Sequence, residues 1–360
     1  MRTIRVDFEG LATFANLHRA YLDARRGKMS RPEILEFTYD VEENLFALAD
    51  ELLAGTYRPG PYRSFVVRAP KRRIVSAAPF RDRVVHHVIA SVLEPALEAR
   101  LIDDTYANRV SKGTHRAVNR CQAFARAYAF FVKFDLVKYF PSIDHGILLG
   151  DLGRVIRTGR FLDLVALVVA SGEGAGFRID PPWVFPGDVP AGGPRPKGLP
   201  VGNLTSQWLA NFFLSPGDHF VMRALGIRAY VRYMDDFVLF ADSREELLAA
   251  RERLGEFLAA RRLRYHEARA GIHATQSGIP FLGMQIHPSY RVLLPARARR
   301  AAKRLARQRR LLAEGRLTAA EFARAVRSWV GHAVHADSYS LRRRILVCAP
   351  PVRKDTAQNA

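Results

Sequence analysis

Cysteine is scarce in this sequence, and no long apolar run occurs in it. The two cysteines, Cys121 and Cys348, lie far apart among 360 residues, so a disulfide framework and a cysteine zinc site are excluded and a reducing compartment is expected. The N-terminus has no apolar core of a signal peptide. Apolar runs such as residues 161–170 are too short to span a bilayer. We therefore expect a cytoplasmic protein with no membrane partner.

Acidic residues are few compared with basic ones. The chain has 56 Lys and Arg against 35 Asp and Glu, a formal net charge of +21. Most of the basic residues are Arg, whose planar guanidinium pairs with phosphate through two parallel hydrogen bonds. A GC-rich genome would supply part of this excess by enriching Arg codons. The resulting charge still favours a polyanionic partner, nucleic acid above all.

The irregular order of helix-like and strand-like segments predicts the α+β class. Residues 31–55 have the apolar spacing of one helix. β-branched pieces within residues 61–83 predict two strands joined at 68–72, and an apolar run predicts a strand at 128–140. Residues 171–200 contain seven Gly and seven Pro, which predicts either a mobile loop beside a functional motif or a surface insertion.

Two adjacent aspartates, Asp235 and Asp236, interrupt an apolar segment at residues 228–242. The flanking "YVRY" and "FVLF" predict two strands, with a two-residue turn at the aspartates that makes a hairpin. A solvated turn is the simplest interpretation. The strands are apolar at nearly every position, however, so the tip is expected inside a cleft. Two carboxylates there repel each other unless a cation neutralises them, and Mg²⁺ binds carboxylates together with substrate phosphates.

A further carboxylate, Asp135, also ends an apolar strand, within residues 130–144. Two acidic sites that converge from distant strands would hold two metal ions about 3.5–4 Å apart, the arrangement for in-line phosphoryl transfer. We therefore predict that Asp135, Asp235 and Asp236 are the catalytic metal ligands. Asp144, in the same segment, is expected to cap the next helix.

Six segments, in order, resemble the motifs of reverse transcriptases. "YMDD" (233–236) resembles the active-site hairpin, and "FDLVKYFPSIDH" (134–145) the motif with the first metal-binding aspartate. The other four are "GLPVGNLTSQWLANFFL" (198–214), between those two motifs; "GIPFLGMQI" (278–286), similar to the primer grip; and "KRRIVSAAPFRDRVVHH" (71–87) and "DTYANRVSKGTHRAV" (104–118), similar to the fingers motifs of bacterial enzymes.

The resemblance implies a right-hand polymerase with fingers, palm and thumb, an antiparallel palm sheet and a helical thumb. It assigns the N-terminal helices and fingers to residues 1–127. The palm takes residues 128–290, with an inserted segment at 150–200. The helical thumb takes residues 291–350, and a tail follows at 351–360. Fewer than eighty residues follow "FLG", so no ribonuclease H, integrase or maturase extension is expected.

The resemblance also implies ligands and residue roles. Asp135, Asp235 and Asp236 would bind two Mg²⁺ ions, with Mn²⁺ as an alternative, assisted by the backbone carbonyl of Leu136. An aromatic ring at Phe140 matches the residue that excludes a ribonucleotide 2′-hydroxyl, which implies a DNA product. The residues implied to contact the dNTP are Lys71, Arg73, Leu136, Phe140, Val201 and Gly202. Those implied to contact the template RNA or the RNA–cDNA duplex are Gln207, Tyr233, Met234, Phe281, Leu282, Gly283, Arg300, Lys303, Arg304 and Arg307.

The C-terminal quarter begins with an expected helix at about 296–314. It carries eight Arg or Lys between residues 297 and 310 and no acid, a pattern suited to the phosphates of a duplex. Further on, Trp329, His332 and His335 follow helical spacing, which we interpret as packing because a metal site needs more ligands than two histidines.

The segment "LPVGNLTSQ" has Val201-Gly202 and Ser206-Gln207 where most reverse transcriptases have Gln-Gly and Ser-Pro. This form is similar to the enzymes of diversity-generating retroelements, as are residues 112–118 and 328–346. The similarity implies error-prone cDNA synthesis, with errors mainly opposite template adenine, and a small basic accessory protein. Because Val201 has no hydrogen-bonding side chain, base-pair geometry would be checked less strictly. The alternatives are a retron or phage-defence reverse transcriptase, an RNA-copying RNA polymerase, and a non-catalytic RNA-binding protein.

Overall fold

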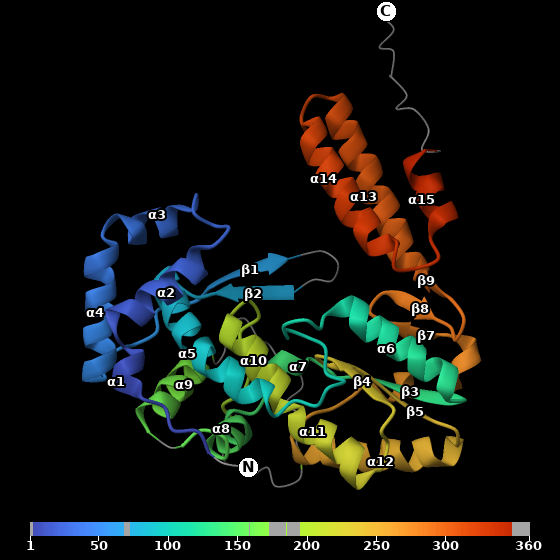
Figure 1. Cartoon of the computed structure of the whole chain (residues 1–360), viewed down its shortest axis with the longest axis horizontal. Helices are drawn as coiled ribbons and strands as arrows, with labels where there is room; N and C mark the ends of the chain where they lie inside the picture. The colour runs from blue at the N-terminus through green and yellow to red at the C-terminus, as the bar shows by residue number, and fades with distance from the viewer. Residues whose placement is uncertain (1–2, 68–72, 158, 173–184, 186–194, 348–360) are drawn as a thin grey trace, which may run out of the picture.

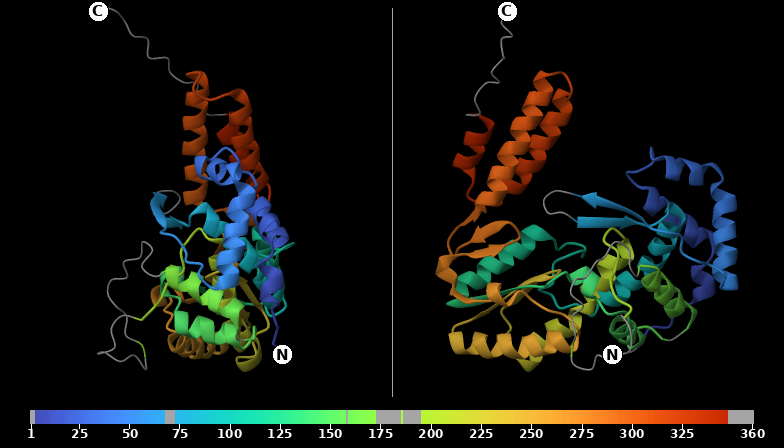
Figure 2. Two further views of the ribbon diagram at one scale, coloured as in Figure 1. Left: turned by 90° about the vertical axis from the view of Figure 1, so that its left-hand side faces the viewer. Right: turned by 180° about the vertical axis from the view of Figure 1, so that it is seen from behind.

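The computed structural model describes residues 3–67, 73–157, 159–172, 185 and 195–347 (Figure 1). Helices of the N-terminal hundred residues lie at one end of the molecule, and the C-terminal helices project from the other. Antiparallel sheets lie between them, as Figure 2 shows from two further sides. The predicted α+β class is therefore confirmed. In the described part of the chain, no helix has both the length and the apolar character needed to cross a membrane.

The N-terminal helices pack around α5, which runs from Phe80 to Glu98. The single helix predicted at 31–55 is two, because the backbone at Asp40 leaves helical geometry with φ −116° and ψ 47°. The second of them ends at Gly55, whose positive φ of 74° places it in the left-handed region that favours glycine. The bounds are α1 Phe8–Leu11, α2 Phe14–Arg25, α3 Pro32–Tyr39 and α4 Val41–Ala54.

The central sheet has four antiparallel strands in the order β4-β5-β3-β6. One face packs in a cluster that includes Phe134 and Phe237, beside α12. The other face packs in a second cluster that includes Phe131 and Phe240, beside α6. The sheet is therefore buried on both sides, which agrees with the apolar residues at nearly every position of the hairpin strands. The bounds are β3 Phe130–Asp135, β4 Tyr230–Tyr233, β5 Asp236–Ala241, β6 Ile272–Ala274, α6 Thr114–Ala127 and α12 Arg244–Ala260.

Two local predictions for this sheet are wrong in detail. The strand predicted at 128–140 ends at Asp135, because Lys138 has a positive φ of 45° and a short helix, α7 (Tyr139–Ser142), follows. The hairpin turn consists of Met234 and Asp235, since Tyr233 pairs with Asp236 across the strands. Met234 has a φ of +58°, as the first central residue of a tight hairpin turn requires.

The remaining elements before the C-terminal quarter surround the central sheet. β1 (Arg63–Val67) and β2 (Arg73–Ala77) are the two strands predicted within residues 61–83, and they pair antiparallel. Asp144 caps α8 as expected, accepting a hydrogen bond from the Ile147 amide at 2.9 Å. The helices are α8 His145–Gly153, α9 Arg160–Ser171, α10 Leu204–Phe213 and α11 Ser215–His219, the last followed by a π-helical turn at Phe220–Ala224.

The C-terminal part begins with a small antiparallel sheet and continues as helices. Trp329 is buried with Leu305, so the packing interpretation is confirmed for this residue. His335 stacks on His115 of α6, with ring centroids 3.5 Å apart, so this packing includes a histidine from a distant segment. The bounds are β7 Ile279–Phe281, β8 Met284–Ile286, β9 Arg291–Leu293, α13 Pro295–Ala313, α14 Ala319–Ala333 and α15 Tyr339–Leu346.

The turn between β7 and β8 should not tolerate a side chain at Gly283. Its φ is +90°, and a Cβ there would lie 2.5 Å from the Arg297 side chain. We expect Gly283→Ala to lower the free energy of unfolding by about 1–2 kcal/mol, measured by urea unfolding. Gly331 lies within α14 with open space around it, so Gly331→Ala should instead add about 0.5–1 kcal/mol. Equal effects of the two substitutions would contradict this expectation.

Candidate active site

The pairing of β3 with β5 brings the three predicted aspartates together. Asp135 lies directly opposite Asp236 in the antiparallel register. Opposite residues of an antiparallel pair project from the same face of a sheet, so these two carboxylates share one face. Asp235 lies in the adjoining turn, and its carbonyl accepts a hydrogen bond from the Leu136 amide at 3.4 Å. The structure thus brings segments a hundred residues apart to one acidic edge.

Two cations contact this acidic edge. Arg269 Nη1 lies 2.8 Å from Asp135 Oδ2. Lys133 Nζ lies 3.1 Å from Asp236 Oδ1 and also donates a hydrogen bond to the Pro280 carbonyl at 2.7 Å. The sequence analysis did not identify Lys133, although its position two residues before Asp135 on one strand places both on the same face.

The electrostatics of Asp236 reflect this crowding. Burial raises the pKa of its carboxyl to about 6; Lys133 opposes the increase, while Asp235 and Asp135 add to it. A divalent cation would relieve the repulsion, and carboxylate oxygens are the donors that Mg²⁺ prefers. The donor set therefore fits Mg²⁺ or Mn²⁺.

A closed metal cage is not preformed. Within the described ranges, no three His, Cys, Asp or Glu side chains are arranged around one ion position. Mg²⁺ sites that act on phosphates are often completed by substrate phosphates and water, so one or two protein carboxylates suffice for each ion. Arg269 and Lys133 also occupy carboxylate oxygens that an ion would use.

The residues predicted on the nucleotide side lie on neighbouring segments. The Val201 carbonyl accepts a hydrogen bond from the Ser76 amide of β2 at 3.0 Å. Gly202 has a φ of +127°, and a Cβ there would lie 3.0 Å from Val75, so glycine permits this close contact. Arg73 is exposed at the start of the same strand.

Phe140 and Lys71 complete the predicted nucleotide side. Phe140 is half-buried in α7, and its carbonyl accepts a hydrogen bond from the Leu199 amide at 2.9 Å, which joins it to the segment of Val201. Lys71 lies outside the described residues.

The residues predicted to contact nucleic acid fall into three groups. Tyr233 and Met234 are half-buried at the hairpin, and Gln207 is half-buried on α10. In the β7–β8 turn Phe281 and Gly283 are buried, so Leu282 has the more exposed side chain. On α13 the predicted basic residues are exposed and share one face by their spacing of three, four and seven: Arg300, Lys303, Arg304 and Arg307.

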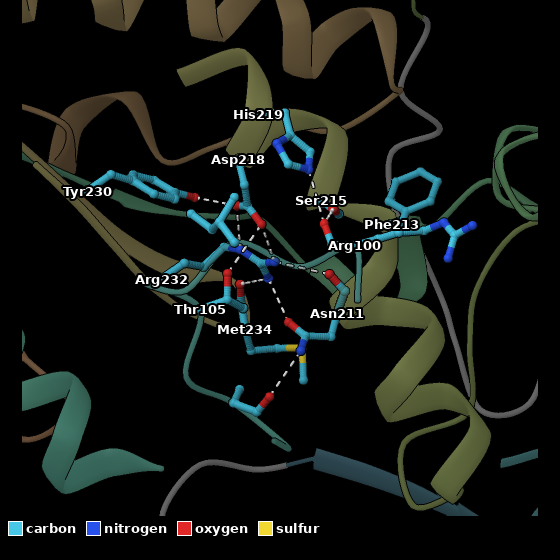
Figure 3. A network of polar contacts seen from close by, with 12 residues as sticks. Arg100, Thr105, Asn211, Phe213, Ser215, Asp218, His219, Tyr230, Arg232 and Met234 are labelled. Carbon is cyan, nitrogen blue, oxygen red and sulfur yellow. Dashed lines mark hydrogen bonds and ion pairs between the residues drawn. The ribbon is translucent and has the colours of Figure 1, made fainter. Parts of the chain in front are cut away.

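The sequence analysis also missed a buried arginine beneath the hairpin. Arg232, the third residue of β4, is fully buried and paired with Asp218 (Figure 3). The signal was present, since a charged residue in an otherwise apolar strand needs a buried partner. Its partner was not recognisable, because Asp218 lies on another element.

The sequence matches one protein family and is similar to several known proteins. The family described as "Reverse transcriptase (RNA-dependent DNA polymerase)" matches residues 67–286. Protein YkfC of Escherichia coli (strain K12) is 24% identical over 279 residues, 66% of this chain and 70% of YkfC. The group II intron-encoded protein LtrA of Lactococcus lactis subsp. cremoris is 24% identical over 195 residues, 53% of this chain and 30% of LtrA.

A plant relative matches a shorter stretch of this chain, and a solved structure is similar over a larger share. Nuclear intron maturase 2, mitochondrial, of Arabidopsis thaliana is 27% identical over 139 residues, 34% of this chain and 19% of the maturase. This chain therefore spans less than a third of LtrA and of the maturase. Apo telomerase from Candida tropicalis has a TM-score of 0.46 and 10% identity, over 64% of this chain and 48% of that one. The TM-score and identity of the telomerase match support no functional conclusion.

The raised pKa of Asp236 predicts a pH-dependent stability in the absence of divalent metal. Folded protein retains the Asp236 proton between the ordinary pKa of 3.8 and about 6, where the unfolded chain has lost it. Stability should therefore fall as pH rises through this range. We expect Asp236→Asn to gain about 1–3 kcal/mol relative to wild type between about pH 4.5 and about pH 7.5.

The free energy of unfolding is measured by urea unfolding in EDTA at both pH values, for wild type and for Asp236→Asn. The exposed Asp163 on α9 provides a matched control, because Asp163→Asn should show no such pH-dependent difference. A constant offset between Asp236→Asn and wild type at both pH values would contradict the expectation.

Proposed function

Because the chain belongs to the reverse transcriptase (RNA-dependent DNA polymerase) family, we propose that it copies a template RNA into cDNA by two-metal nucleotidyl transfer. The observation that carries the proposal is the pairing of Asp135 with Asp236, with Asp235 in the adjoining turn. The fingers, palm and thumb would correspond to residues 1–127, 128–290 and 291–350.

The three carboxylates would hold the metal ions. When bound, two Mg²⁺ ions supply activation of the attacking 3′-hydroxyl and charge stabilisation at the phosphate. Arg269 contacts one oxygen of Asp135 at 2.8 Å, so an ion would bind the other oxygen or displace the guanidinium. Asp236 remains beside Lys133, which offsets part of the negative charge that the hairpin carries.

Other predicted residues would bind and select the substrates. Arg73, exposed at the start of β2, would contact the triphosphate, together with Lys71, two positions earlier in the sequence. Phe140, half-buried beside the Val201 segment, would exclude a 2′-hydroxyl and so select dNTPs. The basic face of α13 would follow the phosphates of the RNA–cDNA duplex, which implies steep salt dependence.

Among reverse transcriptases, we favour the diversity-generating retroelement type. Val201, Gly202 and Gln207 support this choice, because the apolar residue stands where most family members place glutamine. A small basic accessory protein would then help to hold the template RNA. A retron or phage-defence enzyme is the alternative, and the relatives described above, at 24–27% identity, support the family rather than either type.

Primer extension on an RNA template tests the polymerase activity. We expect Mg²⁺-dependent cDNA from wild type and a loss of about 100-fold or more in Asp235→Ala, since the metal site loses a charged ligand. Asp163→Ala removes an exposed carboxylate away from the site and should leave extension unchanged. Undiminished cDNA synthesis by Asp235→Ala would contradict the proposal, and intact RNA binding without any cDNA synthesis would favour a non-catalytic RNA-binding protein.

Sequencing of the cDNA tests the retroelement type. We expect errors concentrated opposite template adenines, and we expect Val201→Gln to reduce them about tenfold, because a hydrogen-bonding side chain would restrict mispair geometry. Val201→Ile keeps the apolar character and should keep the errors. Faithful wild-type cDNA would instead indicate the retron or defence type.

A further inference from the structure

The guanidinium of Arg232 is saturated with hydrogen bonds. Its side chain is fully buried, with 0% exposure. Nε and Nη2 donate to the two carboxylate oxygens of Asp218 at 2.7 and 2.6 Å (Figure 3). Nη1 donates to Asn211 Oδ1 at 2.9 Å and to the Met234 carbonyl at 3.1 Å, and Nη2 donates to the Asn211 carbonyl at 3.1 Å. An arginine has five N–H donors, so all of them are used.

Asp218 is equally well satisfied. It is 1% exposed, and its Oδ1 also accepts a hydrogen bond from the Tyr230 hydroxyl at 2.7 Å. The Thr105 hydroxyl lies 3.4 Å from Oδ2. The buried charges therefore compensate each other, and the pair does not disrupt the core.

The network joins segments that carry different parts of the site. Asn211 belongs to α10, which continues from the Val201–Gly202 segment, and Met234 is the first residue of the hairpin turn. Through the backbone, the Arg232 amide donates to the Asp104 carbonyl at 2.9 Å. Arg232 is therefore the point where α10, the hairpin and the 104–107 segment meet.

Net stability is a poor explanation for this arrangement. A buried ion pair contributes little compared with apolar side chains of similar volume, because both charges must leave water. Such a pair can instead impose geometry, since every donor and acceptor has a fixed direction. The bond to the Met234 carbonyl fixes the peptide that leads directly to Asp235.

We propose that Arg232 is a positioning residue that fixes the Met234–Asp235 turn relative to α10. The metal-binding Asp235 and the nucleotide-facing segment before α10 are thereby held as one unit. This inference rests on the proposed polymerase function. Lysine cannot substitute, because one ammonium with three donors cannot reach Asp218, Asn211 and the Met234 carbonyl together.

The test compares Arg232→Lys with wild type in primer extension and in Mn²⁺ binding measured by electron paramagnetic resonance without nucleotide. We expect kcat to fall about tenfold to a hundredfold, because a small displacement of a catalytic group has effects of this size. We also expect the Kd for Mn²⁺ to rise about three- to tenfold. The KM for template–primer should change much less than kcat, since the basic face of α13 lies outside the network and only Met234 belongs both to the network and to the residues predicted to contact nucleic acid.

A matched control separates positioning from general loosening of the core. Tyr230→Phe removes one hydrogen bond to Asp218 but none to the hairpin turn, so it should lower stability and leave kcat and Mn²⁺ binding unchanged. Arg232→Met combined with Asp218→Asn removes both charges and keeps an acceptor for Tyr230. It covers the case in which Arg232→Lys does not fold, and we expect it to fold with reduced kcat and weakened Mn²⁺ binding.

The outcomes distinguish this inference from the proposed function. Wild-type kcat and Mn²⁺ affinity in Arg232→Lys, or in the folded neutral pair, would overturn the positioning role. A wild-type protein that makes no cDNA would overturn the proposed function, and Mn²⁺ binding would then decide the positioning role alone. A loss of kcat and Mn²⁺ affinity in Tyr230→Phe as large as in Arg232→Lys would also count against it.

Discussion

Like charges meet where β3 and β5 end, because their register places Asp135 directly opposite Asp236 and the turn adds Asp235. Burial and mutual repulsion raise the pKa of Asp236 to about 6, so this edge of the sheet is under electrostatic strain without a cation. Lys133 and Arg269 relieve part of that strain from within the chain. The two hydrophobic clusters that cover the sheet hold the repelling groups in place, and the candidate site depends on that balance.

The ion pairs on the two faces of the hairpin differ in their exposure to water. On the face of Asp236, Lys133 is partly exposed and also contacts the Pro280 carbonyl beside the β7–β8 turn. On the opposite face, Arg232 is sealed from water and its charge is compensated by Asp218. The partly exposed Asp236 can bind an ion while Lys133 stays beside it, whereas the carboxylate of Asp218 is already fully used by Arg232 and its neighbours. One face therefore suits ligand exchange and the other suits fixed geometry.

Local patterns predicted much of this structure, and long-range geometry limited the rest. The β1–β2 pair, the cap at Asp144 and the doubly buried hairpin follow from short sequence signals, as does the convergence of two acidic strands. The turn register was wrong by one residue, since periodicity alone does not distinguish a turn centred on Met234–Asp235 from its neighbour. The Arg232–Asp218 pair was missed because a buried charge identifies the need for a partner but not the element that supplies it.

A saturated pair also restricts how a sequence can change over time. Loss of either Arg232 or Asp218 alone leaves an uncompensated buried charge, at a cost of about 3–5 kcal/mol, which is a large part of the stability of a typical domain. A substitution at one position alone would therefore be removed by selection for stability. Replacement of both charges costs little free energy of unfolding and would be opposed only through reduced activity. Positions 218 and 232 should covary among descendants of this gene, changing together or remaining as they are.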